Sequence, residues 1–150
     1  MAQLERSVAT LRLMGDELVP EEVSRLLNAE PTSAHVKGPQ FLSEPSGRIV
    51  TRNSGMWRLQ ATDSEPEDLN GQVSELLGRV TSDPSVWHEL TARFRVDLFC
   101  GWFMGSGNEG VEILPSTMLA LGQRGIRLSL DIYGPDTSDG DSSDEASPQG

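Results

Sequence analysis

The stretch from Phe94 to Tyr133 constrains the fold of this chain more than any other part of the sequence. It runs FRVDLFCGWFMGSGNEGVEILPSTMLALGQRGIRLSLDIY. Alternation of apolar residues with a period of two predicts strands over 93–103 and 126–133, and apolar residues at helical spacing after Pro115 predict a helix that ends at Gly125. Because these local signals agree with one another, the stretch predicts a well-specified unit of strand, turn, helix and strand.

The rest of the chain predicts more elements of the same two kinds. Alternation predicts strands over 7–14 and 56–61, and helical spacing predicts a helix from Pro20 to about Asn28. Further helices are expected over 67–80 and directly after Asp83-Pro84, and a short strand over 111–114. The predicted core-facing strand residues are Ala9, Leu11, Leu13, Trp57, Leu59, Val96, Leu98, Cys100, Trp102, Ile126, Leu128, Leu130 and Ile132.

These elements predict an α+β fold in a single globular domain over residues 1–134. The natural arrangement is a ferredoxin-like sandwich, in which a mainly antiparallel sheet of four or five strands carries helices on one face. Residues 31–55 hold three prolines and show little periodicity, so we expect a long irregular loop there, or alternatively a hairpin that Ile49 and Val50 start with the next segment. Residues 135–150 have Ala146 as their only apolar side chain besides prolines, which predicts a disordered acidic tail.

The charge and the cysteine content narrow the possible partners and the location. The formal net charge is -11, and five of the negative charges lie in residues 136–150, which leaves -6 for the rest of the chain. Such a protein repels nucleic acid and anionic lipid, so we predict neither a nucleic-acid nor a membrane partner. Cys100 is the single cysteine, and the first residues, MAQLERSVAT, lack the apolar run of a signal peptide. The expected location is therefore the cytoplasm.

The polar positions of the predicted strands lie on the sheet face away from the helices. They are Thr10, Arg12, Arg58, Arg95, Asp97, Arg127, Ser129 and Asp131. One interpretation is a solvated face with charge pairs between strands, and the other is a binding surface for a partner or a polar ligand. Asp97 and Asp131 form an acid/base pair only if they lie on adjacent strands, which sequence spacing does not establish.

No arrangement of reactive residues in the sequence predicts catalysis. Cys100 lies in an apolar run, which favours a buried thiol that behaves as a small hydrophobic side chain. The glycines from Gly105 to Gly110 predict a turn, because a phosphate loop ends in Gly-Lys-Ser/Thr and Glu109 would repel phosphate. The sequence therefore favours a non-enzymatic protein, with no catalytic residue, metal ligand or cofactor.

Three segments of the chain carry a resemblance to a known family. They are GDELVPEEVSRLLNAEPT (Gly15–Thr32), GMW (Gly55–Trp57) and VDLFCGWFMGSGNEGVEILPSTMLALGQRGIRLSLDIYG (Val96–Gly134). Together they resemble the bacterial family domain of unknown function 4279, over about Val8 to Gly134. The resemblance implies an intracellular bacterial domain without an established activity, and it carries over no catalytic residue.

Three hypotheses about function follow. The first is a protein-interaction module of the accessory or immunity type, whose acidic surface attracts a basic protein. The second is a small-ligand binder or enzyme with a polar cleft near Asp97, Asn108, Glu109 and Asp131. The third, compatible with both, is a homodimer formed through an exposed strand edge. The candidate binding surface consists of Trp57, Arg58, Asp97, Trp102, Asn108, Glu109 and Asp131.

Overall fold

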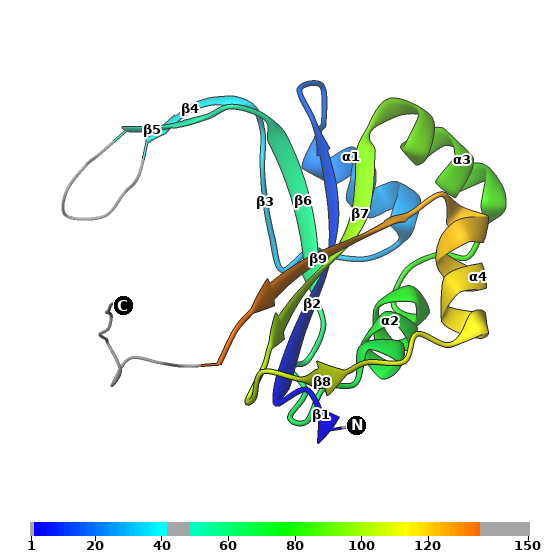
Figure 1. The fold of residues 1–150 in the computed structure, drawn as a ribbon. Helices are drawn as coiled ribbons and strands as arrows, with labels where there is room; N and C mark the ends of the chain where they lie inside the picture. Colours follow the sequence, from blue (N-terminus) through cyan, green and yellow to red (C-terminus); the bar gives the residue numbers. More distant parts are fainter. Residues whose placement is uncertain (1, 42–48, 136–150) are drawn as a thin grey trace.

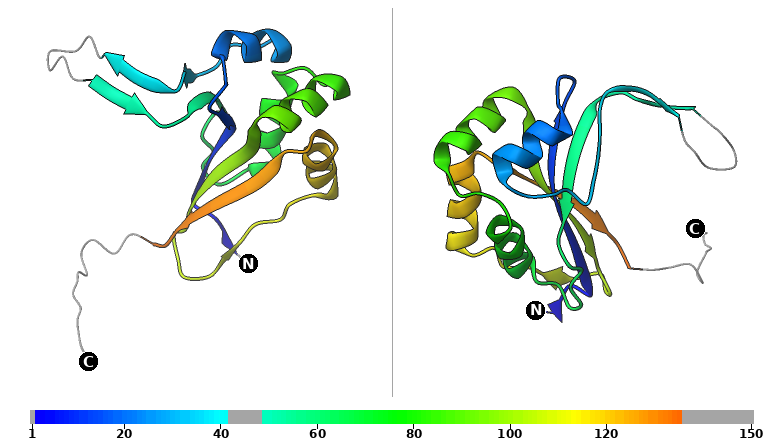
Figure 2. Two further views of the ribbon diagram at one scale, coloured as in Figure 1. Left: turned by 90° about the horizontal axis from the view of Figure 1, so that it is seen from above. Right: turned by 180° about the vertical axis from the view of Figure 1, so that it is seen from behind.

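The computed structural model describes residues 2–41 and 49–135, and the predicted acidic tail after Pro135 lies outside this part. Its helices are α1 (Pro20–Leu27), α2 (Leu69–Gly78), α3 (Pro84–Arg93) and α4 (Pro115–Arg124). Its strands are β1 (Ala2–Gln3), β2 (Arg6–Gly15), β3 (Ser33–His35), β4 (Gly38–Phe41), β5 (Ile49–Arg52), β6 (Gly55–Gln60), β7 (Arg95–Phe103), β8 (Glu109–Gly110) and β9 (Arg127–Tyr133). In Figures 1 and 2 these helices lie on one side of a twisted sheet.

The main sheet has the strand order β3-β6-β2-β7-β9. Strand β2 pairs antiparallel with β6 and β7, β3 pairs antiparallel with β6, and β7 pairs parallel with β9. The prediction of an α+β fold with a mainly antiparallel sheet is therefore confirmed. A ferredoxin-like fold repeats a split βαβ unit, whereas here α4 joins the neighbouring strands β7 and β9, so the ferredoxin-like topology is not confirmed. The single domain over 1–134 stays a prediction.

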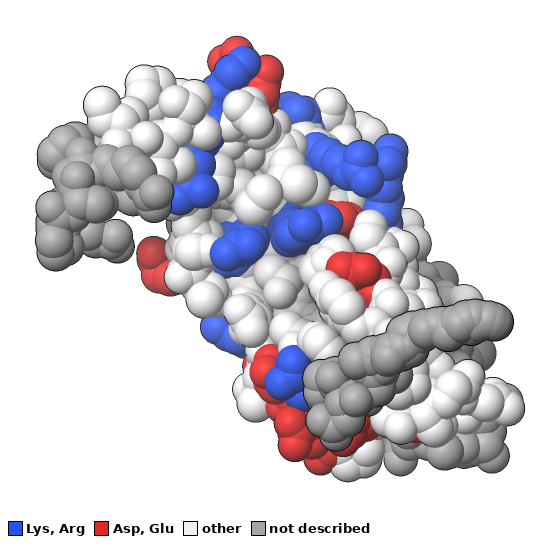
Figure 3. Space-filling view, turned by 60° about the vertical axis from the view of Figure 1, so that its left-hand side comes forward, with Lys and Arg blue, Asp and Glu red and all other residues white. Residues whose placement is uncertain are grey.

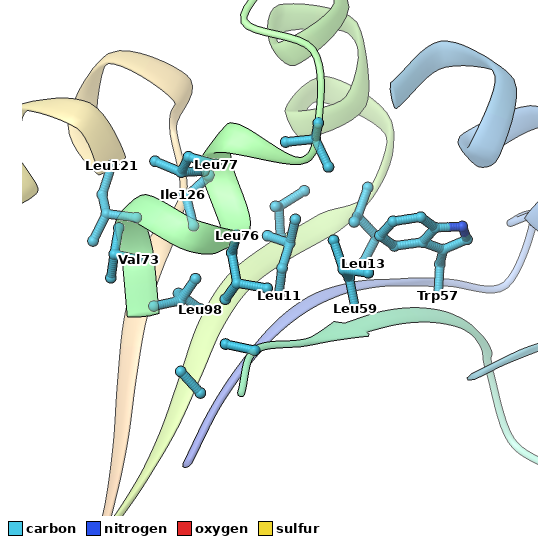
Figure 4. Close-up of a cluster of buried hydrophobic side chains, with 14 of the residues drawn as sticks. Leu11, Leu13, Trp57, Leu59, Val73, Leu76, Leu77, Leu98, Leu121 and Ile126 are labelled. Carbon is cyan, nitrogen blue, oxygen red and sulfur yellow. The ribbon is translucent and has the colours of Figure 1, made fainter. Parts of the chain in front are cut away.

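The core lies between the sheet and the helices. Alternate residues of β2, β6 and β7 point into it, and the buried side chains include Leu11, Leu59 and Leu98. Figure 4 shows these side chains packed against Val73 and Leu76 of α2. The core-facing residues predicted for the strands over 7–14, 56–61 and 93–103 are confirmed, because all of them are buried.

Helices α1, α3 and α4 have ends that their local sequence predicts, whereas α2 is shorter than the predicted 67–80. Pro20 starts α1, whose C-cap Asn28 adopts the left-handed conformation with φ of 57°. The Asp83 side chain accepts a hydrogen bond from the Ser85 backbone N–H (3.0 Å) at the start of α3. Gly125 ends α4 with φ of 73°, a conformation that glycine adopts without strain.

The predicted irregular loop over 31–55 is wrong for most of the described residues in that range. Strand β3 extends the main sheet at its edge, and β4 pairs antiparallel with β5 in a separate two-stranded ribbon. The ribbon projects away from the sheet in Figures 1 and 2. It leaves Ile49 largely exposed, and a ribbon that buries so little shows no clear periodicity in its sequence.

Two predictions about the end of the chain are also wrong. No regular strand forms over 111–114; instead Glu109–Gly110 (β8) pairs parallel with β1, while Val111 and Ile113 pack against the core from an irregular segment. In β9, Leu130 and Ile132 were expected to face the core, yet 41% and 54% of their surfaces are exposed. Figure 1 shows the reason, because the second half of β9 runs away from α4, beyond the helical layer.

Replacement of Leu98 by alanine tests the position of the core. Leu98 is 0% exposed, so the Leu98→Ala substitution should lower the free energy of unfolding by roughly 2–5 kcal/mol. The matched control is Leu119→Ala on α4, where the side chain is 60% exposed and the change should stay within about 0.5 kcal/mol. Denaturant unfolding of both variants measures the difference, and equal effects would contradict the assignment of β7 to the core.

Candidate functional site

The candidate site is the face of the main sheet that carries no helix, which we call the open face. Its side chains alternate with the buried ones along each strand. By this alternation it consists of Arg6, Val8, Thr10, Arg12 and Met14 on β2, Met56, Arg58 and Gln60 on β6, Arg95, Asp97, Phe99, Gly101 and Phe103 on β7, and Arg127, Ser129, Asp131 and Tyr133 on β9.

The strand register aligns four charged residues in one row across this face. Arg58 on β6 lies opposite Arg12 on β2, Arg12 lies opposite Asp97 on β7, and Asp97 lies opposite Arg127 on β9. A carboxylate is thus flanked on both sides by arginine, and a third arginine follows at the next strand. Directly opposite residues in a sheet lie close enough to interact, so the row concentrates positive charge around Asp97.

Asp97 is held by two neighbouring strands. Arg12 donates two hydrogen bonds to its carboxylate, from Nε to Oδ1 (2.9 Å) and from Nη2 to Oδ2 (2.7 Å), and Ser129 Oγ donates a third to Oδ2 (3.0 Å). The Asp97 side chain is 0% exposed and that of Arg12 is 24% exposed. These hydrogen bonds raise the pKa of Arg12 above its ordinary value, so its guanidinium stays charged beside Asp97. Asp97 therefore anchors the sheet and is not a free acid or base.

Aromatic rings and arginine side chains stack on this face. The Arg12 guanidinium lies over the Phe99 ring, 4.4 Å from its centroid, and the Arg6 guanidinium lies 4.1 Å from the Phe103 centroid. Phe103 also stacks on Tyr133, with ring centroids 4.8 Å apart and planes inclined by 12°. These contacts are of the cation–π and offset-stacked kinds, and they hold the two arginines in place.

The charge of the open face is opposite in sign to that of the chain. In the described part it carries five arginines against Asp97 and Asp131, whereas the whole chain has a formal net charge of -11. Figure 3 turns the left-hand side of Figure 1 forward, and basic side chains cross the middle of that side. Among the described residues, Arg95 and Arg127 form no ion pair and Arg58 only hydrogen-bonds Ser33 Oγ (3.1 Å).

Two residues of the predicted binding surface lie in the core, which corrects that part of the prediction. Trp57 alternates with Leu59 toward the helices, is fully buried, and donates a hydrogen bond from Nε1 to Ser24 Oγ on α1 (2.9 Å). Trp102 shares the helix-facing side of β7 and is 7% exposed. Both follow the period of two that the sequence itself shows, and neither contributes to the open face.

The four residues of the predicted polar cleft do not converge. Asp97 and Asp131 lie on adjacent strands, but Asp131 is opposite Gly101, four residues along β7, so the two residues are offset by roughly 13 Å along the strands. Glu109 closes the glycine turn instead, because its carboxylate accepts hydrogen bonds from the Gly105 backbone N–H (2.9 Å) and from Ser106 Oγ (3.2 Å). Asn108 is exposed in the same turn. The geometry therefore offers these residues no shared acid/base chemistry.

Two surface hollows lie elsewhere in the described part of the chain. One, of about 1040 Å³, lies beside α1 and is lined by Ser24 and His35 among others. The other, of about 560 Å³, lies between α2 and the start of α4, near Asn70 and Thr117. Neither is lined by the residues of the predicted cleft.

Across residues 2–41 and 49–135, no three His, Cys, Asp or Glu side chains come together as metal ligands. In the same residues, no helix has the length and apolarity needed to cross a membrane.

The sequence pattern identified most of the charged residues of the open face. It did not reveal that aromatic rings stack with the arginines there. Phe99 and Phe103 follow Asp97 by two and six residues, and these even spacings place them on the same face of the strand. Arg6 was missed because it precedes the predicted strand. The alternation in FRVDLFCGWF contains the signal for the two rings, but the register that brings Arg6 and Tyr133 to Phe103 comes only from the fold.

This structure defines an α+β protein with helices on one face of its sheet and an arginine- and aromatic-bearing surface on the other. The chain belongs to the family described as domain of unknown function (DUF4279), whose family model matches residues 4–135. The resemblance found in the sequence is thereby confirmed. Neither a curated protein nor a solved structure matches the chain.

Removal of one member of the Arg12–Asp97 pair tests its role as an anchor. The Arg12→Ala substitution leaves a buried carboxylate without its counter-charge and should lower the free energy of unfolding by about 2–4 kcal/mol, less than for a fully buried pair because Arg12 is 24% exposed. Asp97→Ala should have a similar cost, and the double variant should cost less than the sum of the two. Thr10→Ala on the same face of β2 is the control, and additive effects in the double variant would contradict the coupling.

The reactivity of Cys100 tests the packing of β7. Burial, followed by the nearby charge of Asp97, raises the pKa of the Cys100 thiol to about 12. At about pH 8 the native protein should therefore react with a disulfide reagent far more slowly than the protein unfolded in guanidinium, since the thiolate is the reactive form. Spectrophotometric thiol titration of both states measures this, and rapid labelling of the native state would show that Cys100 is accessible.

Proposed function

We propose that this protein is a non-enzymatic interaction module that binds an acidic segment of a partner protein through its open face. The observation that carries the proposal is the set of arginines on a sheet face that no described helix covers, in a chain with a formal net charge of -11. An accessory or immunity-type role, in which the module escorts or neutralises its partner, fits such a surface. A bacterial source and a cytoplasmic location stay predictions.

The chemistry of the face suits carboxylates. Arginine is more weakly hydrated than lysine and presents a planar fork of donors that matches a carboxylate. Within the described residues Arg58 and Arg95 form no ion pair, so an acidic segment would supply counter-charges that this part of the chain does not. Arg6 and Arg12 already lie against aromatic rings, which reduces the entropy they lose on binding.

The proposed partner is acidic, whereas the sequence alone predicted a basic partner. A basic partner followed from the net charge of the whole chain, which carries no information about a single face. The open face is positive, so for this surface the complementary partner is acidic. The acidic residues lie mostly on other elements, as at Glu21 and Glu22 on α1.

The stacking contacts of Phe99 and Phe103 favour a protein partner over single-stranded nucleic acid. Proteins that bind single strands stack bases on free aromatic faces. Here Arg12 lies over Phe99, while Arg6 and Tyr133 lie against Phe103, so both rings already have stacking partners within the chain. The negative charge of the rest of the chain further opposes binding of a polyanion as long as nucleic acid.

Affinity capture from the native cells tests the proposal when wild type and two double variants are compared. Arg58→Glu with Arg95→Glu reverses the charge of the open face, and Arg25→Glu with Arg79→Glu makes the same change on the helical side. We expect the first variant to lose its partner and the second to keep it. Raising the salt from ~50 to ~300 mM should release the wild-type complex, because exposed charge pairs are screened.

Three outcomes would overturn the proposal. They are the absence of a stoichiometric partner, a partner that the open-face variant retains, and a complex that nuclease treatment abolishes. The last outcome would replace the protein partner with nucleic acid. Circular dichroism of both variants confirms that each is folded before capture.

A further inference from the structure

The outer edge of β9 is an unpaired strand edge at the end of the main sheet. Strand β9 is last in the order β3-β6-β2-β7-β9 and pairs only with β7 in the described part of the chain. The Met104 N–H donates to the Tyr133 carbonyl on the β7 side (3.0 Å). Because backbone groups alternate in direction along a strand, the amide and carbonyl groups of Leu128, Leu130 and Ile132 face outward.

This edge lacks several of the features that usually protect a free strand. Edge strands are commonly short, interrupted by proline or a bulge, or marked by lysine. The opposite edge strand, β3, has three residues, whereas β9 has seven regular ones, RLSLDIY, without proline or lysine. Leu130 and Ile132 stand exposed beside it on the helix-bearing side, where α4 also exposes Met118 and Leu119.

We propose that β9 pairs antiparallel with β9 of a second copy of this chain, in the register centred on Ser129. In that register Arg127 lies opposite Asp131 of the second copy, and the same pair recurs on the other side of the two-fold axis. Leu128 lies opposite Leu130 of the second copy, and both residues have outward-facing backbone groups, so they exchange two hydrogen bonds at each of the two symmetric positions.

The charges on β9 select this register over its neighbour. Arg127 forms no ion pair within the described residues, and Asp131 accepts a hydrogen bond at Oδ2 from the Tyr133 hydroxyl (2.7 Å), which leaves its second oxygen available. Opposite charges directly across two strands stabilise the pairing. A register centred on Leu130 would instead set Arg127 opposite Tyr133 and Asp131 opposite Ser129, so neither charge would face its complement.

The position of the pair in the antiparallel ladder favours close contact. Arg127 and Asp131 have their backbone groups directed at β7, so in the proposed dimer they occupy a non-hydrogen-bonded position, where opposing side chains approach most closely. On the other side of the sheet, the exposed Leu130 of each copy would lie against the half-buried Leu128 of the other. The dimer goes beyond the proposed binding function, because its backbone contacts use the strand edge, although Arg127 and Asp131 also belong to the open face.

A charge-swap series measured by light scattering and analytical ultracentrifugation tests the dimer in the full-length chain. We expect the wild type to have the mass of a dimer. Arg127→Asp and Asp131→Arg should each raise the dimer dissociation constant at least about tenfold, because each places like charges opposite each other twice. The double variant, Arg127→Asp with Asp131→Arg, should restore the wild-type constant, since the pair is then reversed.

The control is Arg58→Asp, which makes the same charge change on the open face away from β9 and should leave the dimer intact. A monomer at all concentrations, single swaps without effect, or a double swap that does not restore association would each overturn the proposal. Restoration by the double variant also excludes misfolding as the cause of the single-variant effects. The capture experiment uses Arg58 and Arg95, so a failed dimer and a failed acidic partner are distinguishable.

Discussion

The hydrogen-bonded pair of Arg12 and Asp97 fixes how the central strands lie against one another. It joins β2 to β7, and Ser129 extends it to β9, so one carboxylate links three strands at the middle of the sheet. A slip of one residue in either pairing would turn Asp97 toward the helices, where no arginine of β2 reaches it. The alternation of apolar residues on the other face demands the same register, because Leu11 and Leu98 lie opposite each other in the core. Two independent requirements thus select one alignment.

The helices cover one face of this sheet, and the division of chemistry between the two faces follows from that. On the covered face, leucines from β2, β6 and β7 pack with α2, and the tryptophan side chains are held there with them. On the open face no such burial is available, so arginines and aromatic rings cover one another and screen the carboxylate beneath. The same arrangement that lets Asp97 be buried without a second layer of structure leaves neighbouring arginines available for other contacts.

Much of this fold was predictable from the sequence, for reasons that particular residues show. Alternation identified the strands at Leu11 and Leu98, and Asp83 and Gly125 marked helix ends through local backbone chemistry. The β4–β5 ribbon was missed because it buries too little to impose a period, and Leu130 and Ile132 were misplaced because alternation does not show where a helical layer ends. Of the candidate site, Arg58, Asp97 and Asp131 were found, but Trp57 and Trp102 belong to the core. The positive charge of the open face could not be predicted without the strand register, because the register places residues from distant parts of the sequence in one row.

The seven residues of β9 contribute to two surfaces at once, since their odd-numbered side chains belong to the open face and their outward backbone groups form the sheet edge. Antiparallel pairing across that edge would relate the two copies by an axis perpendicular to the sheet, so both open faces would point in the same direction. A partner with two acidic segments would then engage both faces, and its second contact would form at the high effective concentration set by the spacing of the segments. Such a protein would distinguish partners by valency as well as by charge.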